Sequence, residues 1–310
     1  MNPVNAINRC ASIAIVRSSS VGVSNPVTTP AWLAIHSSSP VSAARISFFS
    51  KLTRSLYNLA AMSNPPPPSE FSTPFVEIHR SRDVLTFTLN NPDHGNEVTG
   101  RMFDGMLAEL RCEFLEPRAR VLRIRAQGKV FCTGRERAAR DEASVRAEVT
   151  RLIEFKRLVR TSSLISVAEV QGDAFGFGMG LAVITDFPLV AETASLGFPE
   201  MTHGLAPAAI MAYLGEYALP RFAFPLVLFG QPFTPQVALE IGLISMVCPP
   251  PKLTGVANKL IARILQLDPG ATRRCKEFFL AAQSHTFEKN CGLAAEALIA
   301  GTMAALVGKK

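Results

Sequence analysis

The sequence lacks the patterns that mark metal sites and membrane spans. Its six cysteines form no CxxC pair and show no Cys/His spacing typical of a metal site, so we predict free thiols and no bound metal. No apolar run approaches the roughly 18 residues that indicate a transmembrane helix, and we predict no transmembrane segment. What the sequence does have is 310 residues with 48% hydrophobic content, enough for one sizeable soluble domain with extensions.

Acidic residues are absent from residues 1–61. This segment carries basic residues only, so it supplies most of the formal net charge of +7. The rest of the chain is close to neutral, and its charge therefore does not indicate a polyanion. We expect no nucleic-acid partner on this ground.

Residues 1–61 are also Ser-rich, a composition typical of an organelle transit peptide, and 46–60 have helical amphipathic spacing. The alternative is a translation start at Met62, which makes the segment a non-native extension. We expect a mitochondrial location if the first methionine is the true start. Otherwise we expect a cytoplasmic location, from Met62, or a peroxisomal one. Residues 62–74, with a proline run at 65–68, are predicted to be a linker.

From residue 75 onward, strand-like and helix-like periodicity alternate. The pattern predicts strands at 75–80, 84–90, 119–128 and 164–170, helices at 100–115 and 145–160, and a loop at 195–204 followed by apolar helices to the end. The first two strands are expected to pair around a polar turn. Strands that alternate with helices indicate β-α-β crossovers, so the predicted fold class is α/β with a largely parallel sheet.

Four glycines stand between a strand-like run and an apolar helical run in EVQGDAFGFGMGLAVITD, residues 169–186. The segment is not a phosphate-binding P-loop, because Leu181 follows Gly180 where that motif needs Lys. Its glycine spacing also does not fit the dinucleotide motif GxGxxG. A Gly-rich turn before a helix leaves aligned backbone N–H groups that suit an oxyanion. The alternative is that the glycines only allow close helix packing.

Five stretches follow one another along the chain in this order: LNNPDHGNEVTGRM, FCTG, VQGDAFGFGMGLAVITD, LGFPE and LFGQPFTPQVALEIGLISMV. They resemble, in that order, the loop after the second strand, the FSAG turn, the NGxAxGGGxxLAxxxD segment, the FxxPE motif and the TGxxxxAxxAxxxGLVxxV helix of one family. This is the crotonase superfamily, the enoyl-CoA hydratase/isomerase family, and the resemblance covers about residues 75–310. It implies a crotonase-like ββα spiral core at 75–250. It also implies a C-terminal helical region at 251–310 that assembles a homotrimer or a dimer of trimers.

The resemblance further implies an acyl-CoA substrate, no separate cofactor, and an enolate held by two backbone N–H groups. Aligned residue by residue, these donors are Thr133 in FCTG and Phe177 in GFG. Gly176 and Gly178 would let the backbone approach the ligand. Losing one such donor is expected to cost about 2.7–4 kcal/mol of transition-state stabilisation.

The resemblance also bears on the acid/base groups. Family hydratases use two carboxylates, and here the first position is Gly180, which leaves only Glu200. A single carboxylate can still move a proton from C2 to C4, so the prediction is an enoyl-CoA isomerase with Glu200 as its base. The alternative is a hydratase that recruits Asp173 or His203 as a substitute acid.

The CoA portion is expected to lie near Asn96 and Val98 and near Gly134, Arg135 and Arg137, where the two arginines could meet phosphates. A solvated helix face is the alternative explanation for these arginines. A third interpretation is a catalytically idle, crotonase-like binding or RNA-associated protein. It rests on Phe177 and Gly180, which depart from the family pattern, and on the Arg-rich span 118–160.

Overall fold

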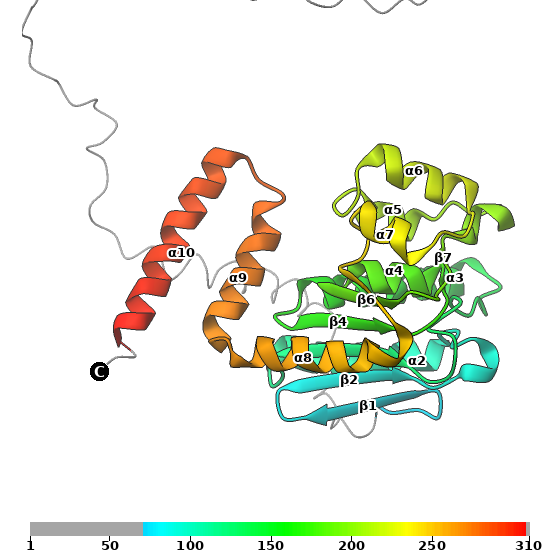
Figure 1. Cartoon of the computed structure of the whole chain (residues 1–310), viewed down its shortest axis with the longest axis horizontal. Helices are drawn as coiled ribbons and strands as arrows, with labels where there is room; N and C mark the ends of the chain where they lie inside the picture. The colour runs from blue at the N-terminus through cyan, green and yellow to red at the C-terminus, as the bar shows by residue number, and fades with distance from the viewer. Residues whose placement is uncertain (1–70, 308–310) are drawn as a thin grey trace, which may run out of the picture.

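The computed structural model describes residues 71–307, so the predictions for 1–61 and for most of the linker lie outside the described residues. Its main sheet has the strand order β1-β2-β3-β4-β6-β8 (Figure 1). The strands are β1 (Val76–Ser81), β2 (Val84–Leu89), β3 (Val121–Ala126), β4 (Ile165–Val170), β6 (Phe187–Ala191) and β8 (Met246–Cys248). β1 and β2 form the expected antiparallel hairpin, and the remaining neighbours are parallel. The predicted α/β class is confirmed.

Helices cover both faces of this sheet. One face carries α2 (Gly100–Leu115), α3 (Glu142–Thr161) and α4 (Phe177–Ile184), and the other carries α8 (Leu253–Gln266). Alternation along β3 divides its side chains between two clusters: Leu122 and Ile124 join the large one, and Val121 joins the small one under α8. Helix α8 buries Val121, Val167 and Leu189 on its face of the sheet, whereas Arg123 and Arg125 of β3 are only half-buried on that face.

Helices α2 and α3 begin at side-chain caps. Thr99 accepts a hydrogen bond from the Met102 N–H at the start of α2, and Asp141 accepts one from the Ser144 N–H at the start of α3. The helix predicted at 145–160 therefore begins three residues earlier than its apolar periodicity suggested. Its cap is polar and carries no periodic signal.

A second, two-stranded sheet pairs β5 (Ala174–Phe175) with β7 (Leu196–Gly197). It is followed by the 3-10 helix η4 (Pro199–His203). The loop predicted at 195–204 is therefore wrong in part, because this segment holds a strand and a helical turn. Such elements are too short to show a period, and tertiary pairing alone forms them.

The region after residue 204 is mostly helical, as predicted, but β8 interrupts it. The other elements are α5 (Ala208–Leu214), α6 (Pro220–Phe229), α7 (Pro235–Glu240), α9 (Pro269–Ala282), α10 (Phe287–Val307), η3 (Pro92–His94) and η5 (Pro250–Lys252). Helix α9 is tied to the sheet by Lys276, whose Nζ donates to the Leu164 carbonyl at 2.5 Å and to Asp186 Oδ2 at 2.7 Å. Asp186 therefore has a structural role.

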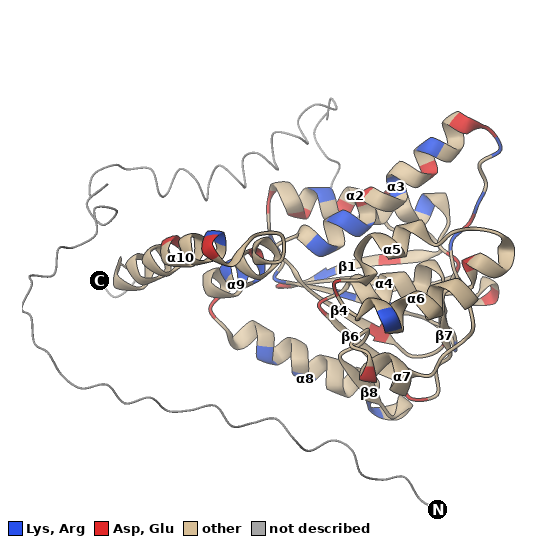
Figure 2. Cartoon of the chain, turned by 90° about the horizontal axis from the view of Figure 1, so that it is seen from above, with Lys and Arg blue, Asp and Glu red and all other residues tan. Residues whose placement is uncertain are grey.

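Helices α9 and α10 stand beside the sheet as a hairpin (Figure 1). Almost all of α10 is uncharged (Figure 2), and its apolar side chains are exposed, among them Leu298, Ile299 and Val307. In the described part of the chain, this one helix is long and apolar enough to cross a membrane, by length and composition only. The prediction of no transmembrane segment overlooked it.

Candidate active site

The glycine segment turns from β5 into helix α4, and the turn exposes backbone donors. Gly176 has φ 52° at the N-cap, a left-handed conformation that disfavours any side chain. The first intrahelical bond runs from the Gly180 N–H to the Gly176 carbonyl at 2.9 Å. The Phe177 N–H, three residues before Gly180, therefore has no backbone acceptor within the described residues. It lies at the positive end of the helix dipole.

Close packing is a second reason for these glycines. A Cβ on Gly178 would lie 2.1 Å from the Cys132 carbonyl oxygen, and one on Gly172 would lie 1.8 Å from the Lys129 carbonyl oxygen. Only glycine lets the FCTG turn touch the start of α4. The packing and oxyanion explanations thus both hold, for different glycines.

The FCTG turn places its donors differently from the prediction. The Thr133 N–H already donates to the Gly95 carbonyl at 2.9 Å, so Thr133 is wrong as an oxyanion donor in this geometry. Val98 bridges the next residues: its N–H donates to the Gly134 carbonyl at 3.1 Å, and its carbonyl accepts from the Glu136 N–H at 3.0 Å. By strand alternation the Arg135 N–H points away from Val98, and it has no backbone acceptor among residues 71–307. The Arg135 N–H is therefore a candidate donor that sequence reasoning did not name.

Glu200 lies in the first turn of η4, against the start of α4. Its Oε1 is 3.2 Å from the position of a Cβ on Gly176, so a side chain there would crowd the carboxylate. Its Oε2 is buried and has no hydrogen-bond partner in the described part of the protein. A buried carboxylate oxygen without a donor indicates a place for a ligand or water. Glu200 thus lies beside the helix start that carries the Phe177 N–H.

Two side chains that sequence reasoning missed occupy the space beside Gly180. A Cβ on Gly180 would lie 2.9 Å from Lys156 Nζ and 3.0 Å from Tyr213 Oη. Lys156 Nζ donates to Tyr213 Oη at 2.9 Å, and the Tyr213 hydroxyl donates to the Gly180 carbonyl at 2.7 Å. Lys156 is 5% exposed, and burial lowers its pKa to about 7, against the opposing effect of the Glu200 charge.

Comparison with known proteins bears on this arrangement. A family model described as Enoyl-CoA hydratase/isomerase matches residues 79–303. The chain belongs to the enoyl-CoA hydratase/isomerase family. It is 29% identical to an enoyl-CoA isomerase/hydratase of Mycosarcoma maydis over 62% of this chain and 75% of that one. It is 28% identical to a 2,3-dehydroadipyl-CoA hydratase of Escherichia coli over 71% of this chain and 86% of that one.

Solved structures show the same crotonase fold. An enoyl-CoA hydratase of Bacillus anthracis superposes with a TM-score of 0.68 at 25% identity, covering 72% of this chain and 89% of that one. A protein of Thermobifida fusca, solved in complex with CoA, superposes with a TM-score of 0.71 at 23% identity, covering 80% of this chain and 100% of that one. The fold predicted from the motif order is confirmed.

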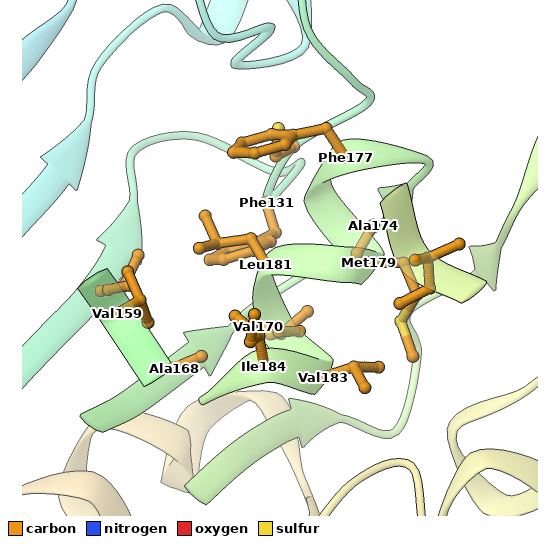
Figure 3. Packing of buried hydrophobic residues seen from close by; sticks show 14 of the residues in the cluster. Phe131, Val159, Ala168, Val170, Ala174, Phe177, Met179, Leu181, Val183 and Ile184 are labelled. Atoms are coloured by element: carbon orange, nitrogen blue, oxygen red, sulfur yellow. The ribbon is translucent and has the colours of Figure 1, made fainter. Parts of the chain in front are cut away.

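In this enoyl-CoA hydratase/isomerase family member, Phe177 stands where the family motif has glycine. Its ring is turned into the core, with its centroid 5.0 Å from that of Phe103 on α2 and 6.1 Å from that of Phe155 on α3. Figure 3 shows the ring above the other buried side chains of α4. Because the side chain leaves toward α2 and α3, the substitution keeps the backbone N–H of this position in the first turn of α4.

The two candidate substitute acids do not belong to the site of this family member. Asp173 Oδ1 accepts from the Ser195 N–H at 2.8 Å, and the Asp173 carbonyl accepts from the N–H groups of Phe131 and Cys132. These bonds tie the two small strands to the FCTG turn, which is a structural task. His203 is exposed at the last turn of η4. Neither residue contacts Glu200 in the hydrogen bonds and ion pairs of the described chain.

Two of the residues predicted to line the CoA site are structural. The Asn96 side chain is buried, accepts from the Asn91 N–H and donates to the carbonyls of Gln127 and Val130, so none of it is left for CoA. The Val98 side chain is fully buried in the main core. Both side chains are therefore structural, and contact of CoA with the backbone of this loop stays a prediction.

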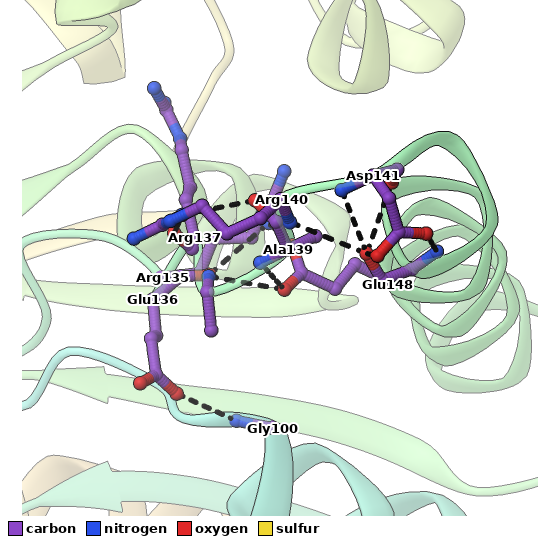
Figure 4. A network of polar contacts seen from close by, with 10 residues as sticks. Gly100, Arg135, Glu136, Arg137, Ala139, Arg140, Asp141 and Glu148 are labelled. Carbon is purple, nitrogen blue, oxygen red and sulfur yellow. Dashed lines mark hydrogen bonds and ion pairs between the residues drawn. The ribbon is translucent and has the colours of Figure 1, made fainter.

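Gly134, Arg135 and Arg137 remain at the surface beside the site. A Cβ on Gly134 would meet nothing within 4 Å, and Arg137 is exposed. Arg135 Nη1 lies 3.5 Å from Glu148 Oε2, and Glu148 Oε1 accepts from the Ala139 N–H at 2.7 Å, so Glu148 holds this segment (Figure 4). Burial is the main cause that lowers the pKa of Arg135, and the Glu200 charge opposes it.

The Arg-rich span 118–160 pairs with acids and carbonyls of the same chain. Arg123 bonds Glu169, and Arg120 donates to the carbonyls at the end of α8. Further pairs are Arg118–Glu113, Arg146–Glu142, Arg151–Asp104 and Arg160–Glu216. Figure 2 shows basic and acidic residues interspersed along α3. The sequence argument for an RNA-associated protein thus loses its main support.

Proposed function

We propose that this protein is an enoyl-CoA isomerase that moves a double bond from C3 to C2 of an acyl-CoA thioester. The observation that carries the proposal is the buried Glu200 Oε2, which has no partner within residues 71–307 and lies beside the helix start that carries the Phe177 N–H. A carboxylate in this position can remove a proton from C2 of a thioester bound by its carbonyl oxygen.

The negative charge that develops on that oxygen needs donors. We assign them to the backbone N–H groups of Phe177 and Arg135, which have no backbone acceptor in the described chain. The first turn of α4 adds the positive end of its dipole. Each donor is expected to stabilise the enolate-like transition state by about 2.7–4 kcal/mol.

A CoA thioester as the substrate is supported by family membership and by two kinds of relative. The curated relatives above are named as enzymes of CoA thioesters, and the Thermobifida fusca structure contains CoA. The exposed guanidinium of Arg137 lies next to the proposed donors in sequence and offers positive charge for a phosphate. The proposed reaction needs no cofactor beyond the thioester and no metal.

Hydration of a 2-enoyl thioester is the second candidate, and the name of the Escherichia coli relative favours it. In the family pattern, addition of water uses a second carboxylate besides Glu200, which helps to hold and activate the water. Asp173 is occupied by the Ser195 N–H and His203 is exposed, so neither replaces it. The isomerase assignment therefore fits the carboxylates of the site better.

A product assay tests the assignment. The full chain is incubated with a 3-enoyl-CoA and separately with a 2-enoyl-CoA, beside Glu200→Gln and the control Glu192→Gln, an exposed acid of the preceding segment. We expect conversion of the 3-enoyl thioester by the wild type and by the control, and its loss in Glu200→Gln. Hydration of the 2-enoyl thioester without isomerisation would overturn the proposal.

We also propose that the exposed apolar side of α10 packs against other subunits, as in the expected homotrimer or dimer of trimers. Two relatives are named as mitochondrial proteins, from Xenopus laevis and Rattus norvegicus. Together with the transit-peptide composition of residues 1–61, these names support a mitochondrial location as a proposal. Organelle fractionation of a tagged full-length chain tests it.

A further inference from the structure

Lys156 is a buried lysine that the surrounding protein supplies with few hydrogen-bond partners. It lies on α3, its side chain is buried, and Tyr213 Oη is the one hydrogen-bond partner of its Nζ among the described residues. A lysine amine or ammonium can make further hydrogen bonds, and burial without them is costly. The remaining capacity of Nζ indicates a ligand or water at this point.

Lys276 shows what a structural buried lysine looks like in the same chain. It is 6% exposed, and its Nζ donates to the Leu164 carbonyl and to Asp186 Oδ2, so the charge has a direct carboxylate partner. Lys156 forms no ion pair with any carboxylate in the described chain. The two residues are equally buried, yet only Lys276 has a carboxylate partner. Lys156 Nζ has the Tyr213 hydroxyl and lies over the rings of Tyr213 and Phe177, 4.9 Å and 5.8 Å from their centroids.

The position of Lys156 Nζ is beside the proposed reaction centre. It lies 2.9 Å from the position of a Cβ on Gly180, one turn along α4 from the Phe177 N–H, and 5.8 Å from the centroid of the Phe177 ring. Because Gly180 has no side chain, Nζ fills the space into which a residue at that position would project. The Tyr213 hydroxyl, bonded to the Gly180 carbonyl, fixes Nζ there.

Three titratable groups face Lys156. Glu200 on η4 raises its pKa, Arg135 beyond the FCTG turn lowers it, and Tyr213 on α5 accepts its hydrogen bond. Burial outweighs these effects and brings the pKa to about 7, so the amine and the ammonium are both populated near neutral pH. The pKa of Tyr213 is raised well above its ordinary value by burial, so its hydroxyl stays protonated.

We propose that Lys156 is the second proton-transferring residue of this site, and that its ammonium protonates C4 of the substrate while Glu200 takes the proton from C2. This deepens the proposed isomerase function and rests on it. Removal of the C2 proton by the Glu200 carboxylate leaves a dienolate. An N–H bond of Lys156 then breaks as the C4–H bond forms, which gives the 2-enoyl thioester, neutral Lys156 and protonated Glu200. After product release, Glu200 loses a proton to solvent and Lys156 gains one.

This arrangement differs measurably from transfer by Glu200 alone. If one carboxylate carries the proton, part of a deuterium label from C2 reappears at C4. If Lys156 supplies the C4 proton, that proton comes from a group in exchange with solvent, and the label does not reach C4. The full chain is therefore given a 3-enoyl-CoA deuterated at C2 in ordinary water, and deuterium at C4 of the product is measured by mass spectrometry.

For the wild type we expect no label at C4. For Lys156→Met we expect kcat to fall roughly 10²–10⁴-fold with little change in KM, because one general acid is lost. Its residual product should carry label at C4, since Glu200 then acts alone. Label at C4 from the wild type, or an unchanged kcat in Lys156→Met, would overturn the proposal.

The pH profile supplies a readout that a merely structural lysine would not change. Lys156 must be protonated to donate, so kcat of the wild type should fall as pH rises through about 7. This decline should be absent in Lys156→Met. It should shift to higher pH in Lys156→Arg, which keeps its charge. The same decline in all three proteins would contradict the proposal.

One further measurement separates failure of this proposal from failure of the isomerase function. The ¹³Cε resonance of Lys156, identified by its absence in Lys156→Met, is followed by NMR while acetoacetyl-CoA is added. We expect the resonance and its titration midpoint to shift, because the thioester lies against Nζ. A resonance that bound acetoacetyl-CoA leaves unchanged would overturn the role of Lys156, whether or not the enzyme isomerises a 3-enoyl-CoA.

Discussion

Replacing Lys156 by methionine should stabilise the protein while it impairs catalysis. Lys156 is buried without a carboxylate partner in direct contact, and burial lowers its pKa from 10.5 to about 7. The unfolded chain therefore binds more protons than the folded chain between these two pH values. Below pH 7 the charged lysine lowers the free energy of unfolding by its full amount, and this effect disappears as the pH rises toward 10.5.

The size of the effect follows from the same two values. One pKa unit corresponds to about 1.4 kcal/mol, so Lys156 lowers the free energy of unfolding by about 4 kcal/mol at pH 7 and by about 2 kcal/mol at pH 9. Methionine has a similar shape and no charge, but it loses the hydrogen bond to Tyr213, worth about 1 kcal/mol. We therefore expect Lys156→Met to be more stable by about 3 kcal/mol at pH 7 and by about 1 kcal/mol at pH 9.

Urea unfolding of both proteins at pH 7 and pH 9, followed by circular dichroism, measures these differences. Lys276→Met is the matched control, because it removes an equally buried lysine that has a carboxylate partner. Losing Lys276 removes the donor to the Leu164 carbonyl and leaves the Asp186 charge with only its hydrogen bonds from Ser166, so this variant should be destabilised by about 3–5 kcal/mol. If Lys156→Met is also less stable than the wild type at pH 7, the reasoning about an unsatisfied lysine is refuted.

Other substitutions test the construction of the site. Gly178→Ala should lower stability by about 1–3 kcal/mol and abolish activity in a product assay, because its Cβ would meet the Cys132 carbonyl oxygen at 2.1 Å. A Cβ on Gly255 of α8 would meet nothing within 4 Å, so Gly255→Ala should stabilise the protein by about 1 kcal/mol; a Gly255→Ala variant less stable than Gly178→Ala would contradict this packing. Phe177→Ala should lower the free energy of unfolding by about 3–5 kcal/mol, because a buried ring is lost. The folded variant should stay active, since the backbone donor remains, and a loss of kcat in a well-folded variant would contradict this. Asp173→Ala should lower stability by about 1–3 kcal/mol with kcat unchanged, and a fall in kcat would restore Asp173 as a candidate acid.

The order of strands and helices was largely predictable because long elements have a clear apolar periodicity in the sequence. β1, β2, β3, β4, α2 and α3 lie where their apolar spacing placed them. β7 and η4 were missed because two to five residues carry no period, and β8 was missed because it is a three-residue strand in a helical region. The two short strands are held by pairing with strands distant in sequence, β7 with β5 and β8 with β6.

The site was predictable where motif order fixed it. Glu200 and Phe177 lie together at the start of α4, as the family pattern implies. The donor in the FCTG turn was misplaced, because only the bond from the Thr133 N–H to the Gly95 carbonyl shows that it is occupied. Lys156 falls among the apolar positions of α3, which is a signal in the sequence, but its approach to Gly180 is a tertiary contact that spacing alone does not reveal.

The central claim is that Glu200 removes a C2 proton from a thioester held by the backbone of Phe177 and Arg135. Exchange of the C2 protons of butanoyl-CoA in D₂O tests it most directly, because a saturated chain can form the enolate and can neither isomerise nor be hydrated. We expect the full-length wild type to incorporate deuterium at C2 and Glu200→Gln to incorporate none. An enzyme that binds butanoyl-CoA without exchanging these protons, or a Glu200→Gln variant that exchanges them at the wild-type rate, would contradict the account.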